Sequence, residues 1–157
     1  METALLKKYN VAAPRYTSYP TVPYWENDKF DQAQWFQALS KSYHQNKGEG
    51  ISLYIHLPFC ESLCTYCGCN TRITKNHAVE SPYINALIKE WEMYCQLLGE
   101  RPKLKELHLG GGTPTFFSPA HLKQLILSIV KEDAADIECS FEGHPDNTTL
   151  AHLQTLY

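Results

Sequence analysis

The chain has 157 residues, of which 43% are hydrophobic and 20% are charged, a composition typical of one globular domain and not of a disordered or low-complexity segment. Its formal net charge of −3 includes no surplus of basic residues, so nucleic acid is not an expected partner. The apolar stretches are far shorter than the ~20 residues of a membrane span and the N-terminus lacks a secretory signal pattern, so we expect a cytoplasmic protein without a membrane span.

The first 50 residues predict an N-terminal arm followed by a helix. Residues 10–23 contain three prolines and no helical period, which favours an extended arm. From Asp28 to His44, large apolar residues recur at helical intervals, which indicates one helix. We therefore treat residues 1–50 as a region separate from residues 51–157.

Residues 51–157 begin with a confidently patterned strand. From Ile51 to Leu57, apolar and polar residues alternate, as in a half-buried strand. A long irregular stretch follows, and then a helix with Ser81 as N-cap, Pro82 at its first position and Gly99 as its stop. Loops of this length are usually functional.

The strand-and-helix pattern then occurs twice more. The second strand, Lys105–Leu109, runs into three consecutive glycines, and Ser118 opens a helix that extends to about Lys131. The third strand, Ile137–Glu142, precedes a helix that starts at Asp146. Strands that alternate with helices imply right-handed crossovers and a parallel sheet, so the predicted fold class is α/β with three βα units.

Each predicted strand also keeps a polar face. In strand order, its side chains are Tyr54 and His56, Glu106 and His108, and Ser140 and Glu142. Small closed barrels fill their interior with bulky apolar residues, so a polar interior favours an open, partial TIM-like barrel of parallel strands whose lumen holds a ligand. The alternative is an antiparallel sheet with one solvated face, which the intervening helices disfavour. We expect His56 and His108 to have hydrogen-bonded structural roles and not to bind metal.

The most specific motif is the stretch CESLCTYCGC, in which Cys60, Cys64 and Cys67 form CxxxCxxC and Cys69 follows. Thiolates are soft ligands for zinc, copper(I) or iron–sulfur clusters. Structural zinc sites usually use two separated CxxC-type pairs, and the sequence has no second pair. Three close cysteines can hold a four-iron cluster and leave one iron open to an outside ligand, whereas Cys69 as a fourth ligand would make a plain electron-transfer site.

Three signals converge on one edge of the predicted sheet. The cysteine motif follows the first strand, Gly110–Gly112 follow the second, and Glu142 closes the third. Parallel sheets carry their functional sites at the carboxyl ends of their strands. The remaining cysteines, Cys95 on a helix and Cys139 on the apolar face of the third strand, are expected in the core.

Together the motifs resemble the radical S-adenosylmethionine (SAM) superfamily, through CxxxCxxC with Tyr66 before its third cysteine and the GGGTP turn after the next strand. More narrowly, PRYTSYPT, YIHLPFC, CGCN and HLGGGTPT are similar to the oxygen-independent coproporphyrinogen III oxidase family, from about residue 9 to residue 157. The resemblance implies the N-terminal part of such a protein, with residues 51–157 as the first three βα units of a partial barrel that is truncated at its C-terminal side.

The resemblance also implies the cofactors. Cys60, Cys64 and Cys67 would ligate a [4Fe–4S] cluster whose fourth iron is chelated by SAM. Positions that match SAM contacts of the family are Tyr54, Tyr66, Gly111, Gly112, Thr113 and Glu142. No catalytic side chain is assigned. Arg15, in the N-terminal arm that the family places near the active site, would pair with a substrate propionate.

The implied activity is oxidative decarboxylation of two propionates of coproporphyrinogen III to vinyl groups, which gives protoporphyrinogen IX in anaerobic haem synthesis. It implies a low-potential electron donor such as a flavodoxin or ferredoxin. Two alternatives stay open: a haem chaperone-like paralogue that keeps the cluster, and a non-enzymatic zinc or iron–sulfur module. PRYTSYPT and Cys69 favour the oxidase. The family is much longer than this chain, so we expect these 157 residues alone not to turn over porphyrinogen.

Overall fold

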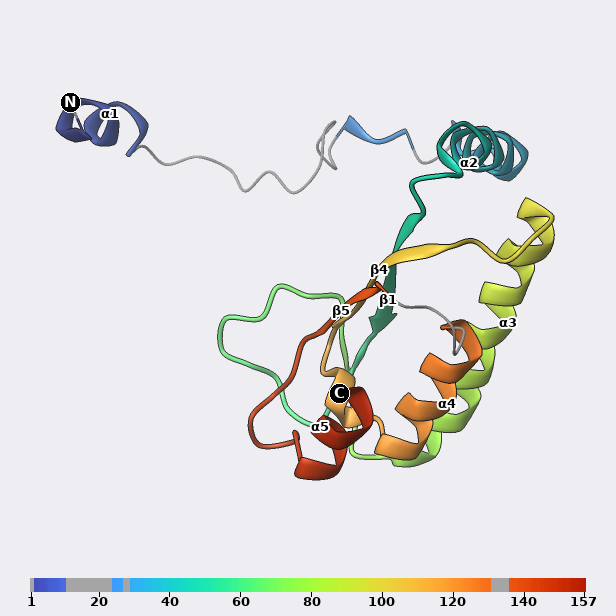
Figure 1. Ribbon diagram of the computed structural model, residues 1–157. Coiled ribbons are helices and arrows are strands. Elements are labelled where there is room, and N and C mark those ends of the chain that lie inside the picture. The colour runs from blue at the N-terminus through green and yellow to red at the C-terminus, as the bar shows by residue number, and fades with distance from the viewer. Residues whose placement is uncertain (1, 11–23, 27–28, 131–135) are drawn as a thin grey trace. The chain divides into compact units, whose positions relative to one another are not determined.

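The computed structural model describes residues 2–10, 24–26, 29–130 and 136–157 (Figure 1). The arm predicted over residues 10–23, with Arg15, therefore lies almost entirely outside the described residues, as does Lys131 at the predicted end of the second helix. The chain divides into two compact units, Met1–Trp35 and Phe36–Tyr157. Among the helices described, none combines the length and the apolar character needed to cross a membrane.

Helices of the N-terminal region are α1 (Glu2–Tyr9) and α2 (Gln32–Asn46). The predicted helix over 28–44 therefore exists but is shifted by a few residues towards the C-terminus. Its late start agrees with Asp31, whose carboxylate accepts a hydrogen bond from the Ala33 N–H at 2.8 Å. A carboxylate that accepts from a backbone N–H in the first turn is the usual way to begin a helix.

The second unit is built on a parallel sheet. Its described strands are β1 (Ile51–Leu57), β4 (Leu104–Gly111) and β5 (Glu138–Phe141), in the order β1-β4-β5. Both neighbouring pairs run parallel. The prediction of an α/β sheet with parallel strands is confirmed, and the first predicted strand matches β1 at both ends.

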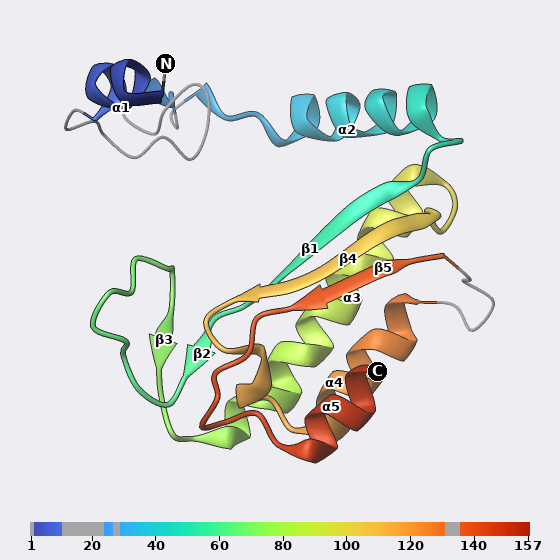
Figure 2. The ribbon, with the colours of Figure 1, turned by 60° about the vertical axis from the view of Figure 1, so that its left-hand side comes forward.

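Helices α3 (Glu80–Leu98) and α4 (Pro119–Ile129) connect consecutive strands of this sheet, and α5 (Leu150–Leu156) follows β5. Figure 2 shows these helices side by side along one face of the sheet. The other face carries the polar side chains of the strands. The connection from β1 to α3 also contains β2 (Phe59–Cys60) and β3 (Arg72–Ile73), which pair in parallel.

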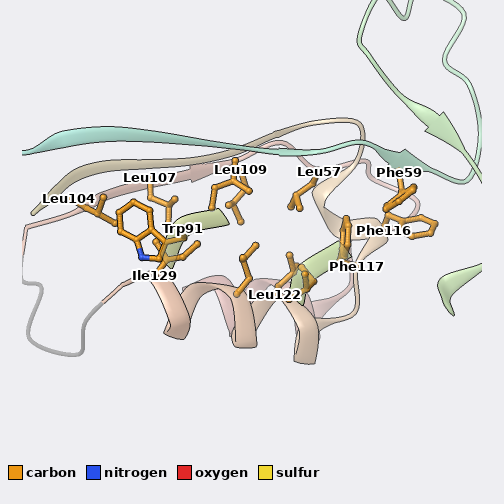
Figure 3. Packing of buried hydrophobic residues seen from close by; sticks show 13 residues of the cluster. Leu57, Phe59, Trp91, Leu104, Leu107, Leu109, Phe116, Phe117, Leu122 and Ile129 are labelled. Carbon is orange, nitrogen blue, oxygen red and sulfur yellow. The ribbon is translucent and has the colours of Figure 1, made fainter. Parts of the chain in front are cut away.

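The hydrophobic core fills the layer between the sheet and its helices (Figure 3). Alternate residues of β1 and β4, such as Leu57 and Leu109, point into it, and α4 contributes the fully buried Leu122 and Leu125. Phe117, from the connection between β4 and α4, is also fully buried. The period of two in the strands and of about 3.6 in the helices therefore accounts for which residues meet.

Replacing Leu122 by alanine is expected to lower the free energy of unfolding by about 2–5 kcal/mol, because the cavity left at a fully buried leucine adds to the lost burial. Leu127→Ala on the same helix is the matched control, since that side chain is 59% exposed, and its effect is expected within about 0.5 kcal/mol. Chemical denaturation of the two variants checks the difference. Equal losses would contradict the placement of α4 against the sheet.

Two helix starts differ from the sequence predictions. Ser81 is not the N-cap of α3: the helix begins at Glu80 and continues from a 3-10 turn, η3 (His77–Val79), whose cap is Asn76. The Asn76 side chain accepts from the Ala78 N–H at 3.1 Å, so the capping signal lies upstream. Pro82 then lies within the first turn, where its missing N–H breaks no intrahelical bond. The predicted stop is confirmed, because Gly99 adopts φ 76°.

The start predicted at Asp146 is also wrong. Helix α5 is capped by Thr149, whose hydroxyl accepts from the His152 N–H while the His152 ring accepts from the Thr149 N–H. This reciprocal pair satisfies two N-terminal donors at once and outcompetes the upstream aspartate. Ser118 is the N-cap of α4 as predicted, and its side chain accepts from the His121 N–H.

The prediction that Cys139 lies in the core is wrong. Cys139 is exposed, because β5 pairs only with β4 among the described strands and Phe141 is the residue of β5 that packs partly against the core. Cys95 is half-buried and packs against the core from α3. The alternating pattern identified the strand but not how well its apolar face is covered.

Candidate functional site

The carboxyl ends of β1 and β4 form a junction made of backbone hydrogen bonds. Beyond β4, the Gly112 N–H donates to the Leu57 carbonyl at 2.9 Å, and the following N–H donates to the carbonyl of Phe59 at 3.1 Å. From the other side, the N–H groups of Arg72 and Thr74 donate to the carbonyls of Pro58 and Cys60, each at 2.8 Å. The backbone of β2 is therefore held on both sides.

The glycines of the GGG motif divide between the strand and this junction. Gly110 and Gly111 belong to β4, so the strand is longer than predicted and the turn begins later. A Cβ on Gly112 would lie 2.6 Å from the backbone carbon and oxygen of Pro58 and 3.0 Å from Cys60 Sγ. Only a glycine at this position lets the two segments approach so closely.

Gly111 has a different constraint. Its φ of 112° is one that side chains rarely adopt, and a Cβ there would lie 2.6 Å from the His56 ring. Its N–H donates to Glu142 Oε2 at 3.0 Å. The structure therefore brings together two of the predicted signals, the glycines after the second strand and the carboxylate that closes the third.

The cysteine loop (residues 61–71) leaves the sheet at the carboxyl end of β1 and returns through β3 (Figure 2). Cys60, at its start, is buried, and the buried Thr113 hydroxyl donates to its Sγ at 3.3 Å. Cys64 and Cys67 are half-buried, and the Cys67 N–H donates to the Cys64 carbonyl at 3.1 Å. Cys60, at the end of β2, and two cysteines of the loop thus present three thiols from one short segment.

Cys69 lies close to the other cysteines although it is exposed. Partial burial raises the pKa of its thiol, and the Cys67 thiol, Glu142 and Cys60 raise that pKa further. Among the described residues, no three or more His, Cys, Asp or Glu side chains lie close enough together to hold a metal ion as they stand. The chemistry of the donors still fits a soft metal or a cluster, because three thiols come from one short segment and thiolates are soft ligands.

The polar face of the sheet carries a second group of predicted residues. The Tyr54 ring stacks on His108, with centroids 5.7 Å apart, and the Tyr54 hydroxyl lies 3.1 Å from His56 Nδ1. His56 Nε2 lies 2.8 Å from the carbonyl of Asn70, at the end of the cysteine loop. Because a carbonyl only accepts, neutral His56 donates from Nε2 and accepts from Tyr54 at Nδ1.

His108 links the same face to β5, since its Nδ1 lies 2.7 Å from the Ser140 hydroxyl and its Nε2 lies 3.8 Å from Glu142. Both histidines are hydrogen-bonded, as predicted. Partial burial raises the pKa of Tyr54, and the neighbouring charge of Glu142 raises it further. The phenol therefore stays protonated and can donate a hydrogen bond.

Most of the predicted site residues meet at this edge, whereas Cys64, Cys67 and Tyr66 lie on the cysteine loop. Tyr54, Gly111, Gly112, Thr113, Glu142 and Cys60 are joined by the contacts above. Tyr66 is 89% exposed on the cysteine loop, so it stands apart from the packed residues. The arrangement combines soft donors, an exposed carboxylate and a close backbone approach beside an open polar face.

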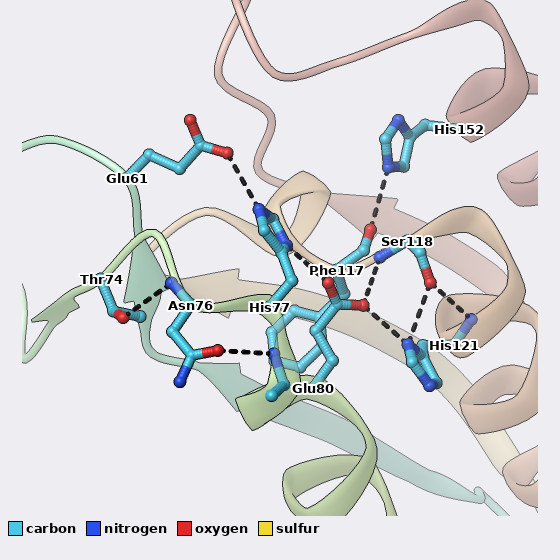
Figure 4. Close-up of polar contacts among 10 residues, drawn as sticks. Glu61, Thr74, Asn76, His77, Glu80, Phe117, Ser118, His121 and His152 are labelled. Carbon is cyan, nitrogen blue, oxygen red and sulfur yellow. Dashed lines mark hydrogen bonds and ion pairs between the residues drawn. The ribbon is translucent and has the colours of Figure 1, made fainter.

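The sequence did not single out Glu80, a buried carboxylate at the start of α3 (Figure 4). Glu80 is only 3% exposed and accepts from the Ser118 N–H and from His121 Nδ1, each at 2.7 Å, and from His77 Nδ1 at 2.6 Å. Burial alone would raise the pKa of Glu80, but these hydrogen bonds lower it. Glu80 therefore joins the starts of α3 and α4 as an ionised group.

The pKa shifts of this network predict a stability optimum in pH. The pKa of Glu80 is lowered from 4.5, so its contribution is present above that value and is lost as the pH falls through the folded-state pKa. The pKa of His77 is raised from 6.5 by its hydrogen bond to Glu80, so its contribution is present below that value and is lost as the pH rises through the folded-state pKa. Urea unfolding across this range checks the shape.

His77→Gln is the matched control, because it removes the histidine and leaves Glu80 with its other donors. The loss of stability on the alkaline side is expected to become smaller in this variant, while the loss on the acidic side remains. If the loss of stability on the alkaline side were the same in this variant as in the wild type, His77 would not be its cause.

Comparison with known proteins gives a consistent result. No protein-family model matches the sequence. The oxygen-independent coproporphyrinogen III oxidase of Pseudomonas aeruginosa is 39% identical over 161 residues, which cover 97% of this chain and 34% of that protein. The enzyme of the same name from Escherichia coli strain K12 is 37% identical over 158 residues, covering 99% of this chain and 33% of that protein.

A solved structure agrees with these relatives. Coproporphyrinogen III oxidase from Escherichia coli, described as a radical SAM enzyme, superposes with a TM-score of 0.74 at 33% sequence identity, covering 98% of this chain and 33% of that chain. The resemblance found in the motifs is therefore confirmed along nearly the whole sequence. This chain spans about a third of the length of the relatives it matches.

Proposed function

We propose that this chain is the N-terminal part of a radical SAM enzyme of the oxygen-independent coproporphyrinogen III oxidase family, in which Cys60, Cys64 and Cys67 bind a [4Fe–4S] cluster. The observation that carries the proposal is the junction at the carboxyl edge, where Gly112 and Thr113 contact Cys60. It joins the two most specific motifs of the sequence in one place. The similarity to coproporphyrinogen oxidases over nearly the whole chain supports the same assignment.

In this proposal the three strand-and-helix repeats are the first units of an open, partial barrel. Their polar face lines the lumen, in keeping with the exposure of Tyr54 and with the hydrogen bonds of His56 and His108. An unclosed barrel leaves room for a cofactor and a large substrate on that face. The opposite face is committed to the core.

When bound, the cluster would supply one electron for the reductive cleavage of SAM, and the radical formed from SAM would attack the substrate. In this proposal, the residues of this chain bind the cluster and SAM and orient them. Cys60 is held in place by the backbone hydrogen bonds of β2, and its sulfur accepts a hydrogen bond from the Thr113 hydroxyl. Gly111 and Gly112 allow a close approach of the backbone, and Glu142 can accept from an ammonium or a ribose hydroxyl of SAM. Tyr54 offers a hydroxyl, and Tyr66 would have to move with its loop to make contact.

We extend the proposal to the substrate and partners of the family. The reaction is the conversion of two propionates of coproporphyrinogen III to vinyl groups, in the cytoplasm, with a low-potential flavodoxin or ferredoxin as electron donor. Because these residues correspond to about a third of the related proteins, we expect no vinyl product from them alone. Chromatographic detection of protoporphyrinogen in a reaction with the isolated chain would contradict that expectation.

Anaerobic reconstitution with iron and sulfide tests the proposed function. We expect about four iron and four sulfide per chain, and an electron paramagnetic resonance signal of the reduced cluster that changes when SAM is added. One zinc per chain without labile sulfide would support a structural metal module instead. A cluster signal that does not change when SAM is added would support an electron-transfer site. The same unchanged signal together with stable haem binding would support the chaperone-like alternative.

A further inference from the structure

His77 lies between two carboxylates that belong to different parts of the chain (Figure 4). Its Nδ1 is 2.6 Å from Glu80 Oε1 and its Nε2 is 3.3 Å from Glu61 Oε1. Glu61 directly follows Cys60 and opens the cysteine loop, while His77 lies in η3 after the loop has returned. The histidine therefore closes the base of the loop through a side-chain bridge.

One end of this bridge is fixed in the interior. The Glu80 side chain is only 4% exposed, and its other hydrogen bonds come from the Ser118 N–H and His121 at the start of α4. The His77 ring also stacks on Phe116, with centroids 4.5 Å apart and planes at 12°. Phe116 is buried, and Glu80 without its partners would be an unpaired charge in the interior, which is costly. His77 is therefore held at two points.

The other end of the bridge is more exposed to solvent. The Glu61 side chain is 38% exposed, and its neighbour Cys60 is held by the backbone of β2 whereas the loop beyond it projects from the sheet. Both carboxylates can only accept, so both ring nitrogens must donate for the bridge to be complete. Hydrogen bonds between charged groups are stronger than neutral ones, which favours the bridged position of Glu61.

We propose that His77 is a positioning residue of the cysteine loop: anchored by Glu80 and Phe116, it holds Glu61 and so sets the direction in which the chain leaves Cys60 towards Cys64. The proposal deepens the proposed function and rests on it only in taking the loop as the cluster-binding segment. The groups that face His77 are Glu61, Glu80 and the Phe116 ring, with His121 on the far side of Glu80. The raised pKa of His77 agrees with an imidazolium in the bridge.

Hydrogen–deuterium exchange of the metal-free protein tests the bridge without using activity. We expect Glu61→Ala and His77→Gln each to speed amide exchange in residues 61–71 roughly threefold to tenfold, the size expected for a partly exposed charged pair. Amides of α4 should not change. Glu49→Ala, which removes an exposed carboxylate outside the loop, is the matched control and should leave loop exchange unaltered.

A double variant separates positioning from general stabilisation. If Glu61 and His77 act through each other, Glu61→Ala with His77→Gln should exchange no faster in the loop than either single variant. In the reconstituted protein, both single variants should lose cluster absorbance to a chelator faster than the wild type by a similar factor. The pH dependence of loop protection in the wild type should be absent in His77→Gln.

The outcomes are distinguishable. Unchanged loop exchange in both single variants, additive effects in the double variant, or equal deprotection of the loop and α4 would overturn the positioning role. A wild-type chain that takes up no cluster but shows the local, non-additive exchange would overturn the proposed function and leave the role of His77 in the loop intact.

Discussion

Serine in place of Cys60, Cys64 or Cys67, one at a time, is expected to abolish the SAM-responsive signal of the reconstituted chain, whereas Cys69→Ser should keep the cluster. The first three thiols come from one loop whose start is fixed by the backbone of β2, and a serine hydroxyl is a hard, poor ligand for a cluster that needs thiolates. Iron and sulfide content and the electron paramagnetic resonance spectrum measure the effect.

Cys69→Ser is the control for this series because it makes the same chemical change two residues beyond Cys67, at an exposed thiol close to the others. Thermal unfolding of the metal-free variants checks that each still folds. Loss of the cluster in Cys69→Ser, with retention in one of the other three, would show that the ligand set is different. Loss of the cluster in all four variants would show that four thiols ligate it; no iron would then be left open for SAM, and the radical assignment would be wrong.

Gly112→Ala is expected to destabilise both the fold and the proposed cluster site. The new Cβ would lie 2.6 Å from the Pro58 backbone, and backbone atoms cannot turn aside as a flexible side chain does. We expect a loss of about 3 kcal/mol in the free energy of unfolding, together with faster loss of cluster, because the displaced segment leads directly into Cys60. Chemical denaturation and chelator challenge measure these two effects.

Gly48→Ala is the matched control, since a Cβ there would meet no atom within 4 Å. Its effect on the free energy of unfolding should stay within about 0.5 kcal/mol. If Gly112→Ala were equally harmless, the backbone junction between β2 and β4 could not be as tight as described, and the glycine would not be needed for it.

The sequence was informative wherever local pattern decides structure. Alternation placed β1 at Ile51–Leu57, and Ser118 and Gly99 marked a helix start and a helix end because their roles are met by their own backbone neighbours. The starts of α3 and α5 were wrong, since the cap that wins depends on which side chain reaches the first N–H groups. Thr149 does so for α5, whereas α3 continues from the turn η3 that Asn76 caps, and neither Ser81 nor Asp146 is the N-cap of its helix.

The candidate site could be predicted in part. The cysteine motif, the glycines and Glu142 follow successive strands, so parallel topology alone brings them to one edge, and the hydrogen bond from Gly111 to Glu142 confirms that convergence. The Glu80 network could not be predicted, because His121 and Glu80 are 41 residues apart and nothing in the sequence pairs them. The spacing of His77 and Glu80, three residues apart at a helix start, was the one local signal.

The unequal support of the cysteine loop affects how it can capture a ligand. Cys60 is held in place by hydrogen bonds of the main chain, while Cys64 and Cys67 lie on the cysteine loop, which projects from the sheet. When the three thiols bind a common ligand, Cys60 is already in place, so the conformational entropy is lost mainly by the few loop residues that carry Cys64 and Cys67. Closing so short a segment costs little conformational entropy. The chain can therefore bind its ligand through small adjustments of the cysteine loop, without disturbing the sheet.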